Sequence, residues 1–358
     1  MSDTKDATAD TRRLILISVP RTASNLLLKI LIISKQPNLL SSPKEGYFFY
    51  SAFLESTVAS GDATRSADQW TEEQKHHIRN SYQKCIESLE EYSSRAIENN
   101  KRMFTKEHSS WLFSPATIQK RVTGIHNDEF FKAFRVDTPE KYGPTKTYSP
   151  SNETIFSDEY LRSWQMAFII RHPALAWPSV YRSLMKMSEF GIMAQDSVIG
   201  TSFTHMDMRW TRLLYDWCLE QPDTPAPPLL DAHDLIHNPE IVLEFCERTG
   251  LDKNALQFEW PDKNEAKKSL IWACHNPEAG DVKVKMHQNA AGVLLVTLEA
   301  STGIVNSKTP ETIDVAAELE SWREELGVEV ATLIENAVRK SMPDYEYLMT
   351  RRLMVKLV

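Results

Sequence analysis

The chain has 358 residues, of which 42% are hydrophobic and 25% charged. This length and composition are typical of one elaborated globular α/β domain, and they exclude a fibrous or an intrinsically disordered protein. The formal net charge of −8 argues against a nucleic-acid partner, because nucleic-acid binding depends on clustered cationic side chains. A small anionic ligand held by two or three local cations fits this charge.

Residues 1–12 are polar and have no apolar core of the kind that a secretory signal needs. We therefore predict a disordered tail over 1–12 and a single domain over 13–358. No stretch approaches the roughly 18 apolar residues of a membrane span, so we expect a cytoplasmic protein without membrane contact. Four widely separated cysteines are typical of reduced, buried thiols rather than of a metal site or a disulfide framework; they are Cys85, Cys218, Cys246 and Cys274.

The expected elements alternate between apolar strands and helices. Such an order predicts an α/β fold with three layers, α/β/α, around a central parallel sheet. We expect helical or loop excursions at about 40–100 and 137–158, and lids over the site from 40–68 and 137–158. In chain order the segments are a strand, loop and helix over 13–35, a polar helix over about 69–99, a strand over 102–108, a strand over 166–171, a helix from 173 and a strand over 227–235.

The stretch LILISVPRTASNLLLKILII, residues 14–33, contains a polar turn between two apolar runs. A strand that leads through a turn into a helix places unpaired backbone N–H groups and the positive end of the helix dipole at the sheet edge, where an anion is favoured. The turn Pro20–Asn25 adds one arginine and three short hydrogen-bonding side chains. It lacks the Gly-Lys-Ser/Thr ending of a triphosphate loop, which argues against ATP or GTP hydrolysis. The alternative is an ordinary turn in which Ser24 or Asn25 caps the helix.

A second candidate site follows the strand that ends at Ile170, in the stretch RHPALAWPSVYRS. If a helix begins at Pro173, Ser179 lies nearly two turns along it and leans back toward Arg171. A guanidinium and a hydroxyl then form an anion site beside the first. In the alternative, Arg171 is a surface ion-pair partner and Ser179 a solvated residue, and Pro178 marks a later start of the helix.

A third candidate site lies in the stretch FTKEHSSWLFSP, at the end of the strand over 102–108. Lys106 and His108 are two residues apart, so both side chains point to the same side of the strand. A histidine at this edge of the sheet can act as a general base, because its unperturbed pKa is near neutrality. The alternative is a solvent-exposed or capping histidine.

In this order and spacing, the three segments resemble the sulfotransferase family, in particular its fungal members. Two later stretches, DAHDLIHNPEIVLEFCERTGLD and MPDYEYL, extend the resemblance to about Leu14–Leu348. The resemblance implies the sulfotransferase variant of the P-loop NTPase-like fold, with 3′-phosphoadenylyl sulfate as co-substrate and no metal. The chain departs from the family pattern where Ala23 replaces a glycine, and where HNPEAGDVKVK lacks the basic element that grasps the 3′-phosphate in the cytosolic branch.

The resemblance also implies roles for individual residues. His108 would be the base, while Lys106 and Arg21 would stabilise the charge that develops on the sulfuryl group and the leaving nucleotide. The loop would hold the 5′-phosphosulfate, and Arg171 and Ser179 the 3′-phosphate. The complete donor-binding set is Arg21, Thr22, Ala23, Ser24, Asn25, Arg171 and Ser179.

The acceptor site is less well indicated by the sequence. Flexible thioethers and aromatic rings between 184 and 217 suit a pocket for a small hydrophobic molecule, although core packing explains them as well. We predict an acceptor with a hydroxyl or amine group, and the oligomeric state stays open between a monomer and a homodimer. The predicted contact residues are Met185, Phe190, His205 and Trp210.

Three functions are compatible with these patterns. The first is a sulfotransferase that acts on a small hydrophobic acceptor in secondary metabolism. The second is an enzyme of the same fold that no longer uses the sulfate donor and catalyses a cyclisation or isomerisation. The third is a non-catalytic protein that binds a nucleotide or a protein partner.

Overall fold

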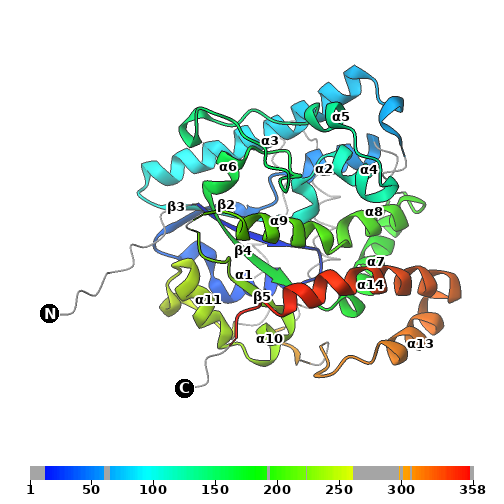
Figure 1. Ribbon diagram of the computed structural model, residues 1–358. Helices are drawn as coiled ribbons and strands as arrows, with labels where there is room; N and C mark the ends of the chain where they lie inside the picture. Colours follow the sequence, from blue (N-terminus) through cyan, green and yellow to red (C-terminus); the bar gives the residue numbers. More distant parts are fainter. Residues whose placement is uncertain are drawn as a thin grey trace.

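The computed structural model describes residues 13–59, 65–191, 194–222, 224–260, 298, 301–306 and 309–354. Its centre is a five-stranded sheet in the order β2-β3-β1-β4-β5, with every neighbouring pair parallel (Figure 1). The strands are β1 (Arg13–Ser18), β2 (Leu39–Gly46), β3 (Arg102–His108), β4 (Trp164–Ile170) and β5 (Leu229–Asp231).

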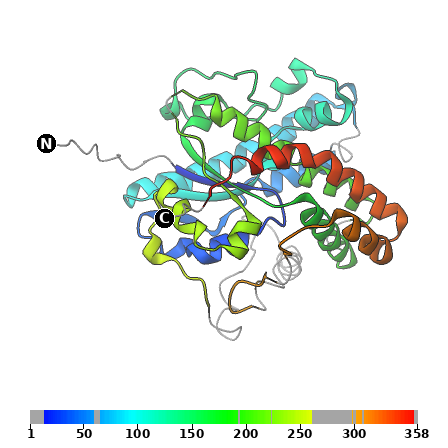
Figure 2. The same cartoon turned by 60° about the horizontal axis from the view of Figure 1, so that its bottom comes forward.

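Helices cover both faces of the sheet, as Figures 1 and 2 show from two directions. The described helices are α1 (Ser24–Leu31), α2 (Tyr50–Ala59), α3 (Glu72–Glu98), α4 (Pro115–Thr123), α5 (Asp128–Lys132), α6 (Asp158–Arg162), α7 (Pro173–Glu189), α8 (Ser197–Met206), α9 (Arg209–Leu219), α10 (Ala232–His237), α11 (Ile241–Thr249), α13 (Val315–Leu326) and α14 (Val328–Met349). Short 3₁₀ turns are η1 (Ile33–Lys35), η2 (Ala67–Gln69), η3 (Ser109–Leu112), η4 (Glu140–Tyr142) and η5 (Lys253–Ala255).

The alternation of side chains along β1 divides the core into two parts. Leu14 and Leu16 pack with α1 and α11 on one face, whereas Ile15 and Ile17 pack with α3, α9 and α14 on the other. This is the predicted three-layer architecture. Because the sheet is parallel throughout, the carboxyl ends of its strands lie at one edge, where Ser18 of β1 pairs with His108 of β3.

Several element boundaries follow the sequence prediction, and others correct it. β3 has the predicted bounds, and α7 begins at Pro173 and continues through Pro178. The strand expected over 227–235 is only Leu229–Asp231, because the Asp231 carboxylate accepts a hydrogen bond from His233 N at 2.7 Å and starts α10. The prediction missed β2, since its polar sequence with Pro43 does not show the pattern of a buried strand.

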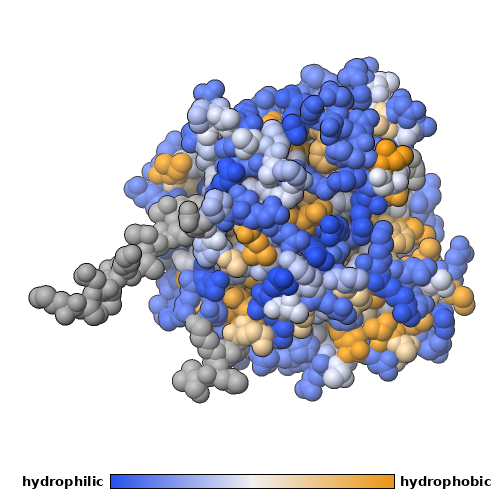
Figure 3. Space-filling model, in the orientation of Figure 1, coloured by the Kyte–Doolittle hydropathy of each residue, from blue (hydrophilic) through white to orange (hydrophobic). Residues whose placement is uncertain are grey.

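The surface is mainly hydrophilic on the face shown in Figure 3, with a group of hydrophobic residues next to the α13–α14 hairpin. In the part of the chain that the structure describes, no helix combines the length and apolar character that crossing a bilayer requires. The three described cysteines, Cys85, Cys218 and Cys246, are buried.

The start of β1 is anchored by a buried arginine. The Arg13 guanidinium forms an ion pair with Glu90 of α3, and both side chains are about nine-tenths buried. Its Cζ atom lies 3.9 Å from the ring centroid of Trp164 and 4.2 Å from that of Tyr142. Arg13 therefore joins the amino edge of the sheet, α3 and the excursion over 137–158.

We predict that Arg13→Ala lowers the free energy of unfolding by about 3 kcal/mol, because it leaves a buried carboxylate without its main cationic partner. Chemical denaturation measures the change. The control is Arg182→Ala, whose ion pair with Glu325 is 40% and 45% exposed, and we expect it to cost less than about 1 kcal/mol. Equal effects in the two variants would contradict the anchoring role.

Candidate active site

The turn Pro20–Asn25 connects β1 to α1 and has an unusual backbone. Arg21 and Ala23 have φ angles of 65° and 60°, in the left-handed region that favours glycine. Ala23 is the N-cap of α1, and no side chain caps the helix, which rules out Ser24 or Asn25 as cap. The first-turn N–H groups of α1, which have no partners within the helix, therefore point to the carboxyl edge of the sheet.

The structure brings the first and second predicted anion sites together. Arg21 Nε donates to Ser179 Oγ at 2.9 Å, and Arg171 Nη1 donates to the backbone oxygen of Arg21 at 3.1 Å. Burial, together with the neighbouring charge of Arg21, lowers the pKa of Arg171 to about 10. Two guanidinium groups thus lie side by side near the positive end of α1, an arrangement that favours a bound anion.

Arg171 also contacts a segment near the C-terminus. Its Nη2 atom donates to Thr309 Oγ1 at 3.2 Å, while His237 Nε2 lies 2.8 Å from the backbone oxygen of Thr309. The region HNPEAGDVKVK, in which the sequence lacks the family's basic element, lies outside the described residues. Thr309 thus brings the late part of the chain into contact with Arg171.

The end of β3 joins the third predicted site to the turn. The Lys106 ammonium donates a hydrogen bond to Asn25 Oδ1. Lys106 is completely buried and His108 is 8% exposed. Burial lowers the pKa of Lys106 and raises that of the neighbouring Glu107. Lys106, Asn25 and His108 thus lie on one side of β3, next to the anion loop.

His108 is held by one polar contact and two rings. Its Nδ1 atom lies 3.0 Å from Ser18 Oγ, and its ring centroid lies 4.5 Å from that of Trp111 and 5.4 Å from that of Tyr47. Burial, with a further contribution from the charge of Lys106, lowers the pKa of His108 well below 6.5. The imidazole is therefore neutral at physiological pH, which is the form that a general base needs.

Aromatic side chains extend this group away from the turn. Trp111 Nε1 donates to Nδ1 of His205 at 3.4 Å, and the His205 ring lies 4.4 Å from that of Phe53. The sequence interpretation named His205 and assigned 40–68, which contains Tyr47 and Phe53, to a lid, but it did not single out Tyr47, Phe53 or Trp111 as site residues. Their signal was present in the aromatic run GYFFYSAF and in the tryptophan just after His108, but neither stretch has the periodicity of a regular element.

The other predicted acceptor residues have different surroundings. Trp210 packs in the core, with its ring 5.1 Å from that of Phe113 and its Nε1 donating to Thr204 O at 2.8 Å. Phe190 is 57% exposed at the end of α7, and Met185 is half-buried on the same helix. His205 is thus the member of the predicted set that the structure places beside the rings around His108.

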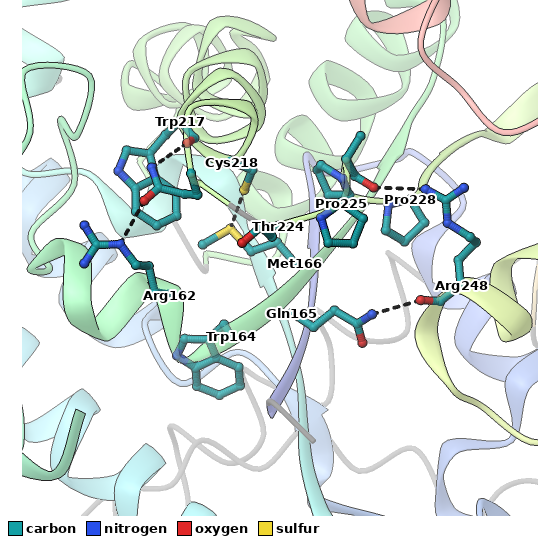
Figure 4. Close-up of a pocket in the computed structure, with 13 residues that line it drawn as sticks. Arg162, Trp164, Gln165, Met166, Trp217, Cys218, Thr224, Pro225, Pro228 and Arg248 are labelled. Atoms are coloured by element: carbon teal, nitrogen blue, oxygen red, sulfur yellow. Dashed lines mark hydrogen bonds between the residues drawn. The ribbon is translucent and has the colours of Figure 1, made fainter. Parts of the chain in front are cut away.

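A small cavity at the opposite edge of the sheet is separate from this site (Figure 4). Its volume of about 40 Å³ suits one or two waters. It lies at the start of β4, between Trp164, Met166 and Cys218, whereas His108 ends β3. Within the described ranges we find no group of three His, Cys, Asp or Glu residues that could hold a metal ion.

Fold and site together define an α/β protein that can bind an anion between a strand–loop–helix unit and the neighbouring strand ends. No family model matches the chain. It is 33% identical over 350 residues to sulfotransferase ppzF of Metarhizium rileyi, covering 95% of this chain and 96% of that protein. It is 34% identical over 349 residues to sulfotransferase ppzF of Metarhizium majus, covering 94% and 96%. The chain therefore belongs to the sulfotransferase family of enzymes.

Two solved structures were also found. The sulfotransferase domain from the curacin biosynthetic pathway is 12% identical, with a TM-score of 0.39, and the match covers 89% of this chain and 98% of that domain. The sulfotransferase domain from the Synechococcus PCC 7002 olefin synthase is 14% identical, with a TM-score of 0.36, and the match covers 92% and 99%.

We predict that Ala23→Gly stabilises the protein by up to about 1 kcal/mol. A left-handed backbone costs a non-glycine residue about 1–2 kcal/mol, and the added freedom of glycine in the unfolded chain offsets part of that gain. Urea denaturation measures the change. As control, Ala317→Gly in the exposed first turn of α13 should destabilise by up to about 1 kcal/mol. If Ala23→Gly lowered the free energy of unfolding as much as Ala317→Gly does, the left-handed conformation of Ala23 would be refuted.

The pKa of His205 gives a test of the buried aromatic group. Burial lowers this pKa from 6.5 to about 3, so the unfolded chain takes up a proton near pH 6.5 and the folded chain does not. Stability therefore decreases as the pH falls below 6.5. Between pH 6.5 and 5 we expect the free energy of unfolding to fall by about 1.6 kcal/mol less in His205→Gln than in the wild type. A His205→Gln stability profile parallel to that of the wild type would contradict the burial of His205.

Proposed function

We propose that this enzyme transfers a sulfuryl group from 3′-phosphoadenylyl sulfate to a hydroxyl or amine of a small hydrophobic acceptor, with His108 as base. One observation carries the proposal: the cationic groups of Arg21, Arg171 and Lys106 converge at the N-terminus of α1, beside a neutral histidine. The cationic groups suit the doubly charged end of the nucleotide, and the neutral histidine beside them suits an uncharged acceptor.

The residues present fit the donor in charge and in hydrogen-bonding capacity. Arg171 and Ser179 would bind its 3′-phosphate, and the first-turn amides of α1 with Thr22 and Ser24 its 5′-phosphosulfate. When bound, the donor supplies an electrophilic sulfuryl group on a good leaving group. The left-handed conformation of Ala23 supports the fit, because this residue adopts the backbone that a glycine would have there.

The protein's own residues would then move one proton and offset negative charge. Nδ1 of His108 donates to the oxygen of Ser18 in the tautomer that leaves Nε2 free to take the proton of the acceptor. Lys106 and Arg21 would stabilise charge that develops on the sulfuryl oxygens and on the leaving oxygen. Their effect is strong because the site is buried and water does not screen it.

The rings around His108 indicate the character of the acceptor. Tyr47, Phe53 and Trp111 are uncharged and largely apolar, and His205 is neutral because burial lowers its pKa. These surroundings disfavour a charged molecule and favour a hydrophobic alcohol, phenol or amine. A place in secondary metabolism stays a prediction from the resemblance to fungal family members, and a cytoplasmic location stays a prediction from the sequence pattern.

Calorimetric titration with adenosine 3′,5′-bisphosphate tests the donor site. We expect wild-type protein to bind it, and Arg171→Ala to weaken binding by about 10- to 100-fold, because a hydrogen bond to a charged group contributes about 1.5–3 kcal/mol. Ser179→Ala should have a smaller effect. The control is Arg182→Ala, which removes an exposed arginine of α7, the helix that carries Ser179. It should bind the nucleotide like the wild type. Absence of heat with wild type would overturn the proposal and favour the donor-independent enzyme.

The same preparations test the base. His108→Asn should retain nucleotide binding while sulfuryl transfer to an alcohol and phenol panel falls by about 10² to 10⁴. Transfer by His108→Asn at the wild-type rate would refute His108 as base and leave the donor site intact.

A further inference from the structure

Two of the groups proposed to act on the reactants are hardly accessible. Lys106 is completely buried and His108 is only 8% exposed. No acceptor reaches the His108 imidazole unless a covering group moves. Trp111 and Phe53 are themselves buried in the core, at 2% and 1% exposure, whereas Tyr47 is half-buried at the surface. Tyr47 is thus the outer cover of the site.

The backbone that carries Tyr47 is fixed to β3. Tyr47 N donates to the Lys106 backbone oxygen at 2.9 Å, and Phe48 N donates to the Glu107 carboxylate at 2.8 Å. A Cβ atom at Gly46 would lie 2.1 Å from the Lys106 oxygen, so the two backbones are in direct contact. The φ angles of 59°, 147° and 63° at Glu45, Gly46 and Tyr47 show the sharp turn that this contact requires. Because the backbone is pinned, the side chain of Tyr47 is the part that can move.

Two polar groups hold the Tyr47 ring in its covering position. Its hydroxyl donates a long hydrogen bond of 3.5 Å to Asn25 Oδ1, and the Lys106 ammonium lies 4.4 Å from its ring centroid. A desolvated ammonium over an aromatic face attracts the ring. Lys106 also donates to Asn25 Oδ1, so the ammonium and the hydroxyl share one acceptor. Both holding groups belong to the proposed donor site.

We propose that the Tyr47 side chain is a gate over Lys106 and His108, and that a nucleotide in the donor site opens it by engaging Lys106 and Asn25. The proposal rests on the proposed function, because it assigns both residues to the donor. An anionic donor draws the ammonium away from the ring and accepts a hydrogen bond from Asn25 Nδ2, which turns Asn25 Oδ1 away from the Tyr47 hydroxyl, so these two attractions on Tyr47 weaken together. The acceptor then enters after the donor, and the base stays protected while the donor site is empty.

The reaction of histidines with diethyl pyrocarbonate, followed by peptide mass spectrometry, measures the gate without a known acceptor. This reagent acylates neutral imidazole, and the exposed His76 and His126 serve as internal standards in each sample. The variants are Tyr47→Ala and Tyr47→Phe. The matched control is Tyr50→Ala, since the Tyr50 ring lies 5.2 Å from that of Trp111 in the same segment. Each protein is treated with and without adenosine 3′,5′-bisphosphate, whose binding is verified by calorimetry.

We expect Tyr47→Ala to raise the acylation rate of His108 by about tenfold or more, because loss of a desolvated cation–π contact shifts an equilibrium by roughly that factor. Tyr47→Phe should show a smaller increase, and Tyr50→Ala less than about a twofold change by the same reasoning. Nucleotide should raise the His108 rate in wild type and leave that of Tyr47→Ala unchanged.

Each contrary result refutes one part of the proposal. An unchanged His108 rate in Tyr47→Ala, with unchanged standards, refutes the gate. Bound nucleotide that leaves the wild-type rate constant, or lowers it, refutes the coupling between donor and gate. Absence of nucleotide binding refutes the proposed function, while the Tyr47→Ala comparison without nucleotide still decides whether Tyr47 covers His108.

Discussion

Three consecutive ionisable side chains, Lys106–His108, are buried at the carboxyl end of β3. Taking such groups out of water costs several kcal/mol each unless their polar atoms find partners. The partners come from three neighbouring segments: Asn25 of α1 accepts from the ammonium, the Phe48 amide donates to Oε1 of Glu107, and Ser18 of β1 contacts the imidazole. The second oxygen of Glu107 has no hydrogen-bond partner in the described part of the chain. The positions of the anion loop, the Tyr47 turn and the base therefore all depend on this one strand end.

The same burial sets the chemistry of the site. It disfavours charge on His108, which keeps the imidazole unprotonated, and it lowers the pKa of Lys106, so that an approaching anion has a strong effect on this amine. Arg21 and Arg171 stay cationic under these conditions and provide the permanent positive charge. The amine of Lys106 lies beside these fixed positive charges and the neutral His108. Its protonation state therefore responds to the binding of an anion.

The sequence predicted what depends on local pattern and on strand ends. The turn Pro20–Asn25, the bounds of β3 and the start of α7 at Pro173 all have local signals. The direct contact between Arg21 and Ser179 did not follow, because it depends on how a loop and a helix, 158 residues apart in the sequence, orient their side chains. Tyr47, Phe53 and Trp111 were missed for a related reason: aromatic residues at irregular spacing look the same whether they fill the core or surround a base.

The anchoring of Arg13 lies at the amino edge of the sheet, and the reactive groups lie at the carboxyl edge. The residues that stabilise the fold at the amino edge thus differ from those that form the site at the carboxyl edge. A substitution of Tyr47 or Phe53 therefore leaves the contacts of Arg13 with Glu90 and Trp164 in place, and the sheet keeps its anchor when the surroundings of His108 change.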